Sequence, residues 1–107
     1  MAAVGDEQEL DLSNSDVVTK YKAAAEIANK AIAAVAAACK DGARIVDLCR
    51  MGDEIISKDA AAIFKGKVSG SDKGIAFPTC VSPNSIVGHL SPMGDDTTTL
   101  KDGDLVK

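Results

Sequence analysis

The stretch Gly74–Asn84, GIAFPTCVSPN, is where the chain changes character and where its fold is decided. The runs 75–82 and 86–90 carry the apolar and β-branched residues that are typical of short strands. The tripeptide Pro83-Asn84-Ser85 between them has turn chemistry, so the pattern predicts a β-hairpin. Pro78 lacks a backbone N–H, which indicates a bulge or an edge position within the first strand.

The residues after this hairpin indicate a sheet that the chain does not complete. A polar stretch over 94–99 leads to a turn at Asp102-Gly103, and Leu105–Lys107 has the character of the first residues of a further strand. A sheet this small lacks the partner strands that it needs to close. We therefore expect an α+β fold of which this chain is the N-terminal part.

Upstream of the hairpin, the apolar spacing predicts a long helix over residues 16–40. Ser13 and Asp16 approximate a capping box at its start, and Asp41-Gly42 ends it. Its apolar residues recur at steps of four and three, which puts them on one face. They are Tyr21, Ala25, Ala28, Ile32, Val35 and Cys39.

A second helix is predicted over residues 45–64, and the short connection 41–44 makes the two helices an antiparallel hairpin. Residues 65–73 (KGKVSGSDK) form a loop, and the acidic segment 1–12 is expected to be a disordered tail in front of one domain, 13–107. The apolar face of the second helix comprises Ile45, Cys49, Gly52, Ile56, Ala60 and Ile63 with Phe64.

The composition is that of one small domain with an aliphatic core. Of 107 residues 46% are apolar, 17 of them alanine, and the chain has no Trp. The longest uncharged apolar run, Ala31–Cys39, is too short for a membrane span, and the acidic N-terminus argues against a secretory signal or a transit peptide. Three cysteines without a C-x-x-C pair favour reduced thiols in the cytosol or nucleus.

The net charge of −4 is unevenly distributed. Residues 1–16 carry five acids and no base, residues 17–73 carry ten bases against seven acids, and residues 74–107 carry two bases against four acids. An acidic protein is not a nucleic-acid binder by net charge, but the middle of the chain has room for a local basic face.

Few residues carry an evident chemistry. The single histidine, His89, excludes a histidine-rich metal site, and the sequence has no P-loop or dinucleotide motif. The His89 ring, between Gly88 and Ser91-Pro92, either faces a cleft or has a structural role. The lysines Lys65, Lys67 and Lys73 either contact phosphate or keep a loop soluble.

Several separated motifs together resemble a known family. GIAFPTCVSPN, then GHLSP over 88–92 and DGDLVK over 102–107, is similar to the opening of the pita-bread fold of the creatinase and aminopeptidase proteins, and to type II methionine aminopeptidases in particular. The first helix, with VVTKYK over 17–22 and IANK over 27–30, instead resembles the proliferation-associated, or ErbB-receptor-binding, relatives that are not peptidases.

This resemblance implies a much longer protein. In the active enzymes two aspartates, one histidine and two glutamates hold a dinuclear metal centre, and none of these ligands can be placed on this sequence. His89 matches a histidine that contacts the substrate in the peptidases. Without a metal to activate water, that histidine has no hydrolytic mechanism. We therefore expect no cofactor, no metal site and no catalytic residue in this chain.

The resemblance implies a non-catalytic regulator of growth and translation, with ribosomal or pre-ribosomal particles, structured RNA and other proteins as partners. It would be found in the cytoplasm and nucleolus, with no membrane association, and Lys65, Lys67 and Lys73 are the candidate RNA contacts. One alternative is an active type II methionine aminopeptidase in which His89 positions the substrate. The other is a stand-alone helical hairpin that binds a protein partner.

Overall fold

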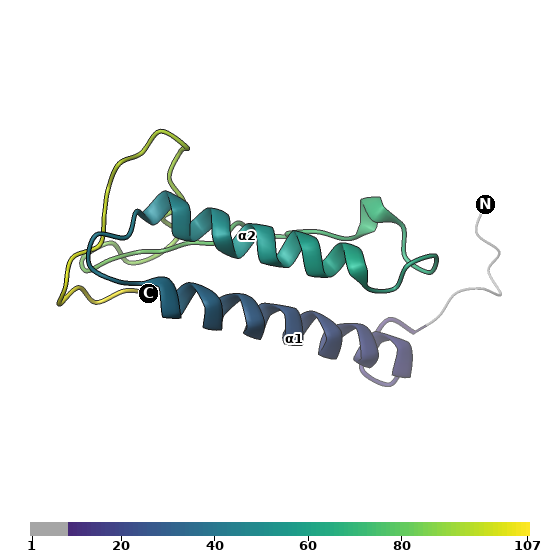
Figure 1. Ribbon diagram of the computed structural model, residues 1–107. Coiled ribbons are helices and arrows are strands. Elements are labelled where there is room, and N and C mark those ends of the chain that lie inside the picture. The colour runs from purple at the N-terminus through teal and green to yellow at the C-terminus, as the bar shows by residue number, and fades with distance from the viewer. Residues whose placement is uncertain (1–8) are drawn as a thin grey trace.

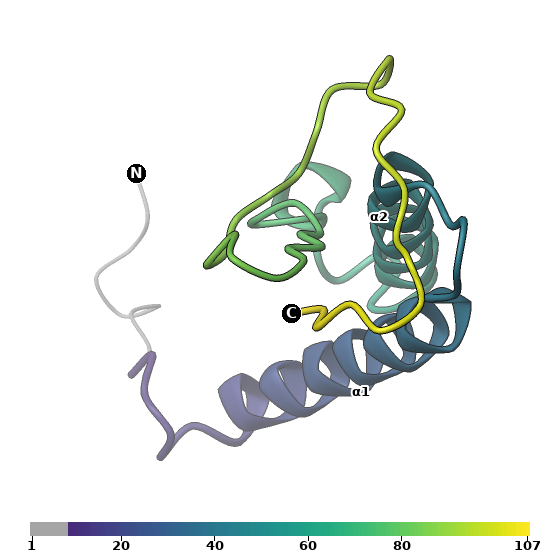
Figure 2. The same ribbon diagram turned by 90° about the vertical axis from the view of Figure 1, so that its left-hand side faces the viewer.

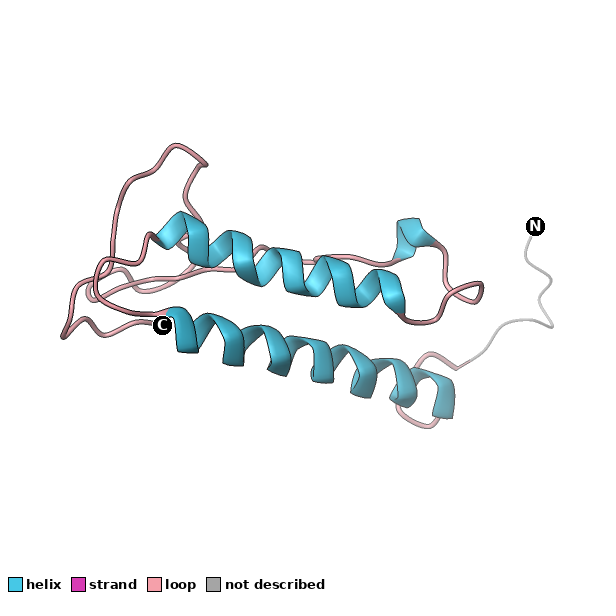
Figure 3. Cartoon of the chain, in the orientation of Figure 1, coloured by secondary structure: helices cyan, strands magenta, loops and turns pink. Residues whose placement is uncertain are grey.

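A computed structural model describes residues 9–107, and its dominant feature is a pair of helices. Helix α1 (Ser15–Ala38) and helix α2 (Ile45–Ala62) lie side by side and are joined by a short turn (Figure 1). A single 3-10 turn, η2 (Gly70–Asp72), follows. Residues 73–107 are irregular and lie against one side of the helix pair (Figures 2 and 3). The predicted helical hairpin is therefore confirmed, and no helix within 9–107 is long and apolar enough to cross a bilayer.

The start of α1 differs by one residue from the predicted cap. The side chain of Asn14, rather than that of Ser13, accepts a hydrogen bond from the Asp16 backbone N–H at 2.9 Å. Ser13 donates both its backbone N–H and its hydroxyl to the Asp11 carboxylate, so its side chain is engaged in the preceding turn. Of the predicted tail 1–12, residues 1–8 lie outside the described residues, and Asp11 belongs to this turn.

The buried face of α1 is rotated from the predicted stripe. Ala31 and Val35 are its buried residues, whereas Tyr21 and Ile32 are each 68% exposed. From the predicted set, Val35 is buried and Cys39 is half-buried, while Ala25 and Ala28 are exposed. One apolar side of α1 packs on α2, and a second apolar side, which carries Tyr21 and Ile32, is largely exposed.

Helix α2 buries the face that its sequence predicts. Ile45, Cys49 and Gly52 are buried, and so are Val46 and Leu48. Its N-terminus has no side-chain cap. A distant segment satisfies the N-terminal groups instead, because the N–H of Ile45 donates to the carbonyl of Thr98 at 3.0 Å.

The same segment holds the turn between the helices. The Leu100 N–H donates to the Ala43 carbonyl, and the Gly42 N–H donates to the Leu100 carbonyl, both at 2.8 Å. The Arg44 guanidinium adds a 2.7 Å bond to the Asp96 carbonyl. These bonds fix the irregular C-terminal part of the chain to the closed end of the helix pair.

The predicted β-hairpin is not formed as regular strands. No residue within 9–107 lies in a regular strand, and one backbone–backbone bond, from the Val81 N–H to the Leu90 carbonyl at 2.9 Å, joins the two predicted runs. The physical reason is that too few backbone groups are available for pairing. Prolines 78 and 83 have no N–H to donate, and the Leu90 N–H donates to the Ser82 hydroxyl instead of to a backbone carbonyl.

The predicted further strand, Leu105–Lys107, does find a partner. Ser82 and Lys107 exchange two backbone hydrogen bonds of 2.8 and 3.0 Å, and Pro83 and Val106 form an antiparallel bridge. This pairing lies on the edge of 81–84 opposite to Leu90, because successive N–H groups of an extended chain point to opposite sides.

The hydrophobic core is small and lies at the closed end of the helix pair. Val81 and Leu100, from the irregular segment, are inserted beside α2 with exposed fractions of 2% and 3%. The molecule measures 56 × 25 × 21 Å, with a radius of gyration of 17.4 Å. A compact domain of this length would have about 13 Å. The core is formed by Val35, Ile45, Leu48, Cys49, Val81 and Leu100.

Helix α2 and the irregular segment approach most closely at Gly52. A Cβ placed on Gly52 would lie 2.8 Å from Cγ2 and 3.1 Å from Cβ of Thr79, and closer still to its hydroxyl oxygen. One residue further along, the Asp53 carboxylate accepts a 2.8 Å bond from the Thr79 N–H. Thr79 therefore packs directly on the helix, because Gly52 leaves room for its side chain and the Asp53 carboxylate binds its N–H.

We predict that Gly52→Ala destabilises the protein despite the better helix propensity of alanine. Overpacking typically costs about 1–3 kcal/mol, against a helix gain of about 1 kcal/mol. A net loss of up to about 2 kcal/mol should lower the melting temperature by several degrees. Thr79→Ala in the same chain should recover part of the loss in a double-mutant cycle. A Gly52→Ala variant more stable than the parent would contradict the tight contact.

Candidate functional site

The His89 side chain lies at the surface against an aromatic ring. The ring centroids of His89 and Phe77 are 5.1 Å apart with an interplanar angle of 68°, an edge-to-face arrangement. Phe77 is 59% exposed, so the pair presents an aromatic face to solvent. The His89 backbone has φ 63°, a conformation that costs a non-glycine residue about 1–2 kcal/mol. Bonds from its neighbour Leu90 to residues 81 and 82 hold it there.

Further apolar side chains are exposed on the same irregular segment. Val87 is 91% exposed and Met93 is 79% exposed, and Ile75 and Ile86 are partly covered. A surface that is rich in uncovered apolar side chains marks a place where another chain or a ligand packs. On this segment, the sequence indicated His89 as the candidate site residue. The contact with Phe77 became visible only once two separate loops were placed together.

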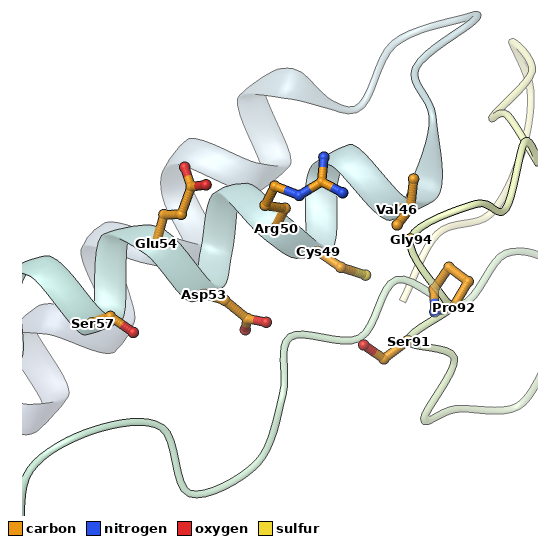
Figure 4. Close-up of a pocket in the computed structure, with 9 residues that line it drawn as sticks. All are labelled: Val46, Cys49, Arg50, Asp53, Glu54, Ser57, Ser91, Pro92 and Gly94. Carbon is orange, nitrogen blue, oxygen red and sulfur yellow. The ribbon is translucent and has the colours of Figure 1, made fainter. Parts of the chain in front are cut away.

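A shallow polar groove runs between α2 and the segment after His89 (Figure 4). Its volume is about 330 Å³. Figure 4 shows Asp53 and Cys49 directed from the helix toward the strip that carries Ser91, with Arg50 above them. Arg50 is paired with Asp47 at 3.2 Å. The groove is lined by Val46, Cys49, Arg50, Asp53, Glu54, Ser57, Ser91, Pro92 and Gly94.

The thiols near this region are poor nucleophiles. Burial raises the pKa of the Cys49 thiol, which lies 3.9 Å from the Leu90 carbonyl, and burial also raises the pKa of Cys39. A raised pKa leaves less thiolate at neutral pH. The three cysteines form no disulfide.

The three predicted lysines lie in the connection after α2, away from His89. Lys65 and Lys67 are exposed in a turn, whereas the Lys73 ammonium donates to the Ile63 carbonyl at 2.9 Å. Lys73 thereby satisfies a backbone group at the C-terminal end of α2, where a cation is favourable. Lys20 of α1 and Lys73 line one apolar hollow of about 270 Å³. The structure thus leaves Lys65 and Lys67 free for contact and gives Lys73 a structural bond.

The described residues do not form a metal site. Within 9–107, no three side chains of His, Cys, Asp or Glu are grouped closely enough to hold an ion. The Asp96 carboxylate accepts a bond from the Thr98 N–H at 2.8 Å, which lowers its pKa. The residues within 9–107 therefore do not fit the dinuclear centre of the peptidases.

The order of these elements matches a known family. The model of metallopeptidase family M24 matches residues 19–107, and the chain belongs to this family. Within it, the chain is 51% identical over 102 residues to ErbB-3 binding protein 1 of Arabidopsis thaliana, covering 95% of this chain and 26% of that protein. The expected resemblance to proliferation-associated proteins is confirmed.

Two further relatives are similar over nearly the same region. Proliferation-associated protein A of Dictyostelium discoideum is 54% identical over 97 residues, 91% of this chain and 25% of its own length. A curved DNA-binding protein of Schizosaccharomyces pombe is 43% identical over 99 residues, 90% of this chain and 26% of its own length. The chain spans about a quarter of the length of these curated relatives.

We predict that acid weakens the pairing of residues 82–84 with 105–107. The Asp104 carboxylate accepts bonds from the Asn84 amide at 3.0 Å and from the Lys101 N–H at 2.8 Å, and these bonds lower its pKa. A lowered folded pKa contributes stability that is present above the unfolded value of about 3.9. This stability is lost as pH falls through the folded value.

Thermal unfolding between pH 6 and pH 3 measures this effect. Asp104→Asn should lower stability at pH 6 and flatten the loss in acid. Asn84→Gly should do likewise, since it removes the first donor while accepting the positive φ of 52° at that position. Unfolding profiles of both variants that parallel the parent's across this range would contradict the role of Asp104.

Proposed function

We propose that this chain is the N-terminal part of a non-catalytic M24 protein that acts by binding ribosomal or pre-ribosomal particles and structured RNA, and so regulates growth and translation. The observation that carries the proposal is its 51% and 54% identity to relatives named for binding ErbB-3 and for proliferation. The name of a third relative refers to curved DNA, which supports nucleic acid as one partner. Activity in the cytoplasm and nucleolus, without membrane association, is part of this proposal.

The exposed lysines of the connection after α2 are the proposed RNA contacts. Lys65 and Lys67 project from a turn, and Lys20 borders the adjoining hollow. Lysine ammonium groups attract phosphate without reading base identity, so this surface suits backbone contact with folded RNA. The role of Lys73 in this proposal is to hold the turn through its bond to Ile63.

The exposed apolar segment suits a protein partner. Phe77, Val87 and Met93 are all more than half exposed. Aromatic and methionine side chains are enriched at protein interfaces. In this proposal the exposed lysines after the C-terminal end of α2 contact RNA, and the exposed apolar side chains of the irregular segment contact a protein partner.

Two alternatives make different use of the same features. In a methionine aminopeptidase, the exposed Phe77 and His89 pair would contact the substrate, and metal ligands would come from outside this chain. As a stand-alone module, the helical hairpin would bind its partner through the bare apolar side of α1. The elongated shape and the small core at one end favour a part of a larger domain over such a module.

We predict that Lys65→Ala with Lys67→Ala weakens RNA binding. Fluorescence anisotropy with a structured ribosomal RNA fragment should show a several-fold loss of affinity in the full-length protein. The slope of log affinity against log salt should become shallower by about 1–2, because RNA binding releases fewer counterions when fewer phosphates are contacted. Lys40→Ala with Lys101→Ala, which removes two exposed lysines at the other end of α1 and α2, is the matched control. Equal affinities for the two double variants would refute the assignment.

We predict that the full-length protein does not release N-terminal methionine from peptides when Co(II) or Mn(II) is added. A coupled assay for free methionine, run beside an active type II enzyme, measures this. Turnover that approaches that of the enzyme and falls on His89→Ala would establish the peptidase alternative instead.

A further inference from the structure

The connection after α2, residues 63–74, lies at the end of the helix pair that is opposite to the turn between the helices (Figure 1). Its first part is a tight turn in which two backbone N–H groups donate to the Phe64 carbonyl, both at 3.0 Å. Its second part is the 3-10 turn η2, which begins directly after Ser69. Two exposed serines, Ser69 and Ser71, therefore follow the exposed lysines within one short surface segment.

Ser69 carries its hydroxyl on an extended and exposed stretch of backbone. Its φ is −61° and its ψ is 144°. The Ser69 Oγ accepts a hydrogen bond from the Ser71 N–H at 3.3 Å and lies 2.9 Å from the Ser71 hydroxyl oxygen. These bonds stay within one turn, so moving the hydroxyl breaks no contact with the helices. A protein kinase must bring such a hydroxyl to its catalytic base and to the phosphoryl donor, and this serine can be brought there with little rearrangement.

An acidic residue stands one turn after this serine. The Asp72 N–H donates to the Ser69 carbonyl at 2.9 Å, and Asp72 is exposed. Residues three apart in a 3-10 turn lie on the same side of it. Kinases choose their substrates partly by charge pattern, and a carboxylate three residues after the serine suits a kinase with a basic substrate groove. Hydroxyl, backbone and charge at Ser69 thus all fit an acid-directed kinase.

Other hydroxyls with the same spacing to an acid are engaged elsewhere. Ser13 has an aspartate three residues on, but its hydroxyl donates to the Asp11 carboxylate. Thr99 has one as well, but it forms an antiparallel bridge with Arg44 in the segment that is fixed to the closed end of the helix pair. Of these three hydroxyls, the fold leaves that of Ser69 available for reaction.

We propose that Ser69 is a phosphorylation site and that its phosphoserine weakens RNA binding by the adjoining Lys65 and Lys67. In the transfer, the Ser69 Oγ attacks the γ-phosphorus of Mg·ATP, and the bond from that phosphorus to the bridging oxygen of ADP breaks. The hydroxyl proton passes to the catalytic base of the kinase, and ADP leaves. The effect on RNA rests on the proposed function, whereas the modification site does not.

The effect on RNA follows from the charge that the phosphate adds. Phosphoserine carries a charge of about −1.5 to −2 at pH 7. Two residues of chain span at most about 7 Å, so the phosphoserine lies within the Debye length of about 8 Å from the Lys67 backbone. The added charge is large enough to offset the two lysine charges, and it repels the phosphates of the RNA.

The first test maps the site in the full-length protein. Incubation with Mg·ATP and an acid-directed kinase of the casein kinase type, followed by mass spectrometry, should place a phosphoryl group on Ser69. Asp72→Asn should slow modification of Ser69 at least fivefold. Ser71→Ala is the matched control and should leave it in place. Absence of phosphate at Ser69, its presence on Ser71 instead, or a rate that Asp72→Asn does not change would each overturn the proposal.

The second test measures RNA affinity by fluorescence anisotropy with the structured ribosomal RNA fragment. The protein phosphorylated at Ser69 should bind several-fold more weakly than the unmodified protein, and its affinity should depend less steeply on salt. Kinase-treated Ser69→Ala protein controls for phosphates elsewhere and should keep the parent's affinity. In the Lys65→Ala and Lys67→Ala double variant, phosphorylation should change the affinity less than in the parent.

The two tests separate this inference from the proposed function. RNA binding that depends on Lys65 and Lys67 but is unchanged by phosphate on Ser69 would overturn the inference and leave the proposed function standing. An unmodified protein that does not bind RNA would overturn the proposed function and, with it, the effect of phosphate on RNA binding. The mapping experiment then decides the modification site by itself.

Discussion

The structure depends on the way in which two short apolar segments of the irregular half are fixed to the closed end of the helix pair. Leu100 is held by two backbone bonds to the turn between the helices. The Val81 N–H donates to the Leu90 carbonyl, and the neighbouring Ser82 exchanges two backbone bonds with Lys107. The side chains of Leu100 and Val81 are almost fully buried against Ile45, Leu48 and Cys49. Because the helices bury few residues against each other alone, these insertions supply much of the core. The helix-capping role of Thr98 follows from the same placement.

Part of the apolar surface of α1 has little cover. Tyr21 and Ile32 are largely exposed, and an apolar groove remains along α1. Sheets form where several strands satisfy each other's backbone groups. Here residues 75–90 take part in one bridge, between Pro83 and Val106, and contain two prolines, so they stay irregular. The side chains around Val81 and Leu100 are therefore well packed, whereas α1 keeps apolar side chains that are largely exposed.

The surfaces relevant to function lie outside the core, on the irregular segment and on the connection after α2. The aromatic pair of Phe77 and His89 lies on the irregular segment, and the exposed lysines follow the C-terminal end of α2. Membership of family M24 gives the chain its scaffold, but relatives with the same scaffold carry names that refer to protein binding, proliferation or DNA binding. Function within this family is therefore decided by particular residues on the scaffold and not by the scaffold itself.

The two helices, their antiparallel connection and the buried face of α2 followed from the sequence alone, since helix periodicity and turn residues are local properties. The family resemblance followed as well, because its motifs are contiguous. Local patterns did not determine which side of α1 is buried, since both sides are apolar and only the position of α2 selects Ala31 and Val35. The structural bond of Lys73, the contact of Phe77 with His89 and the pairing of Ser82 with Lys107 each join residues from separate segments. Only the tertiary structure decided them, because backbone and side-chain donors go to whichever acceptor the fold brings within reach.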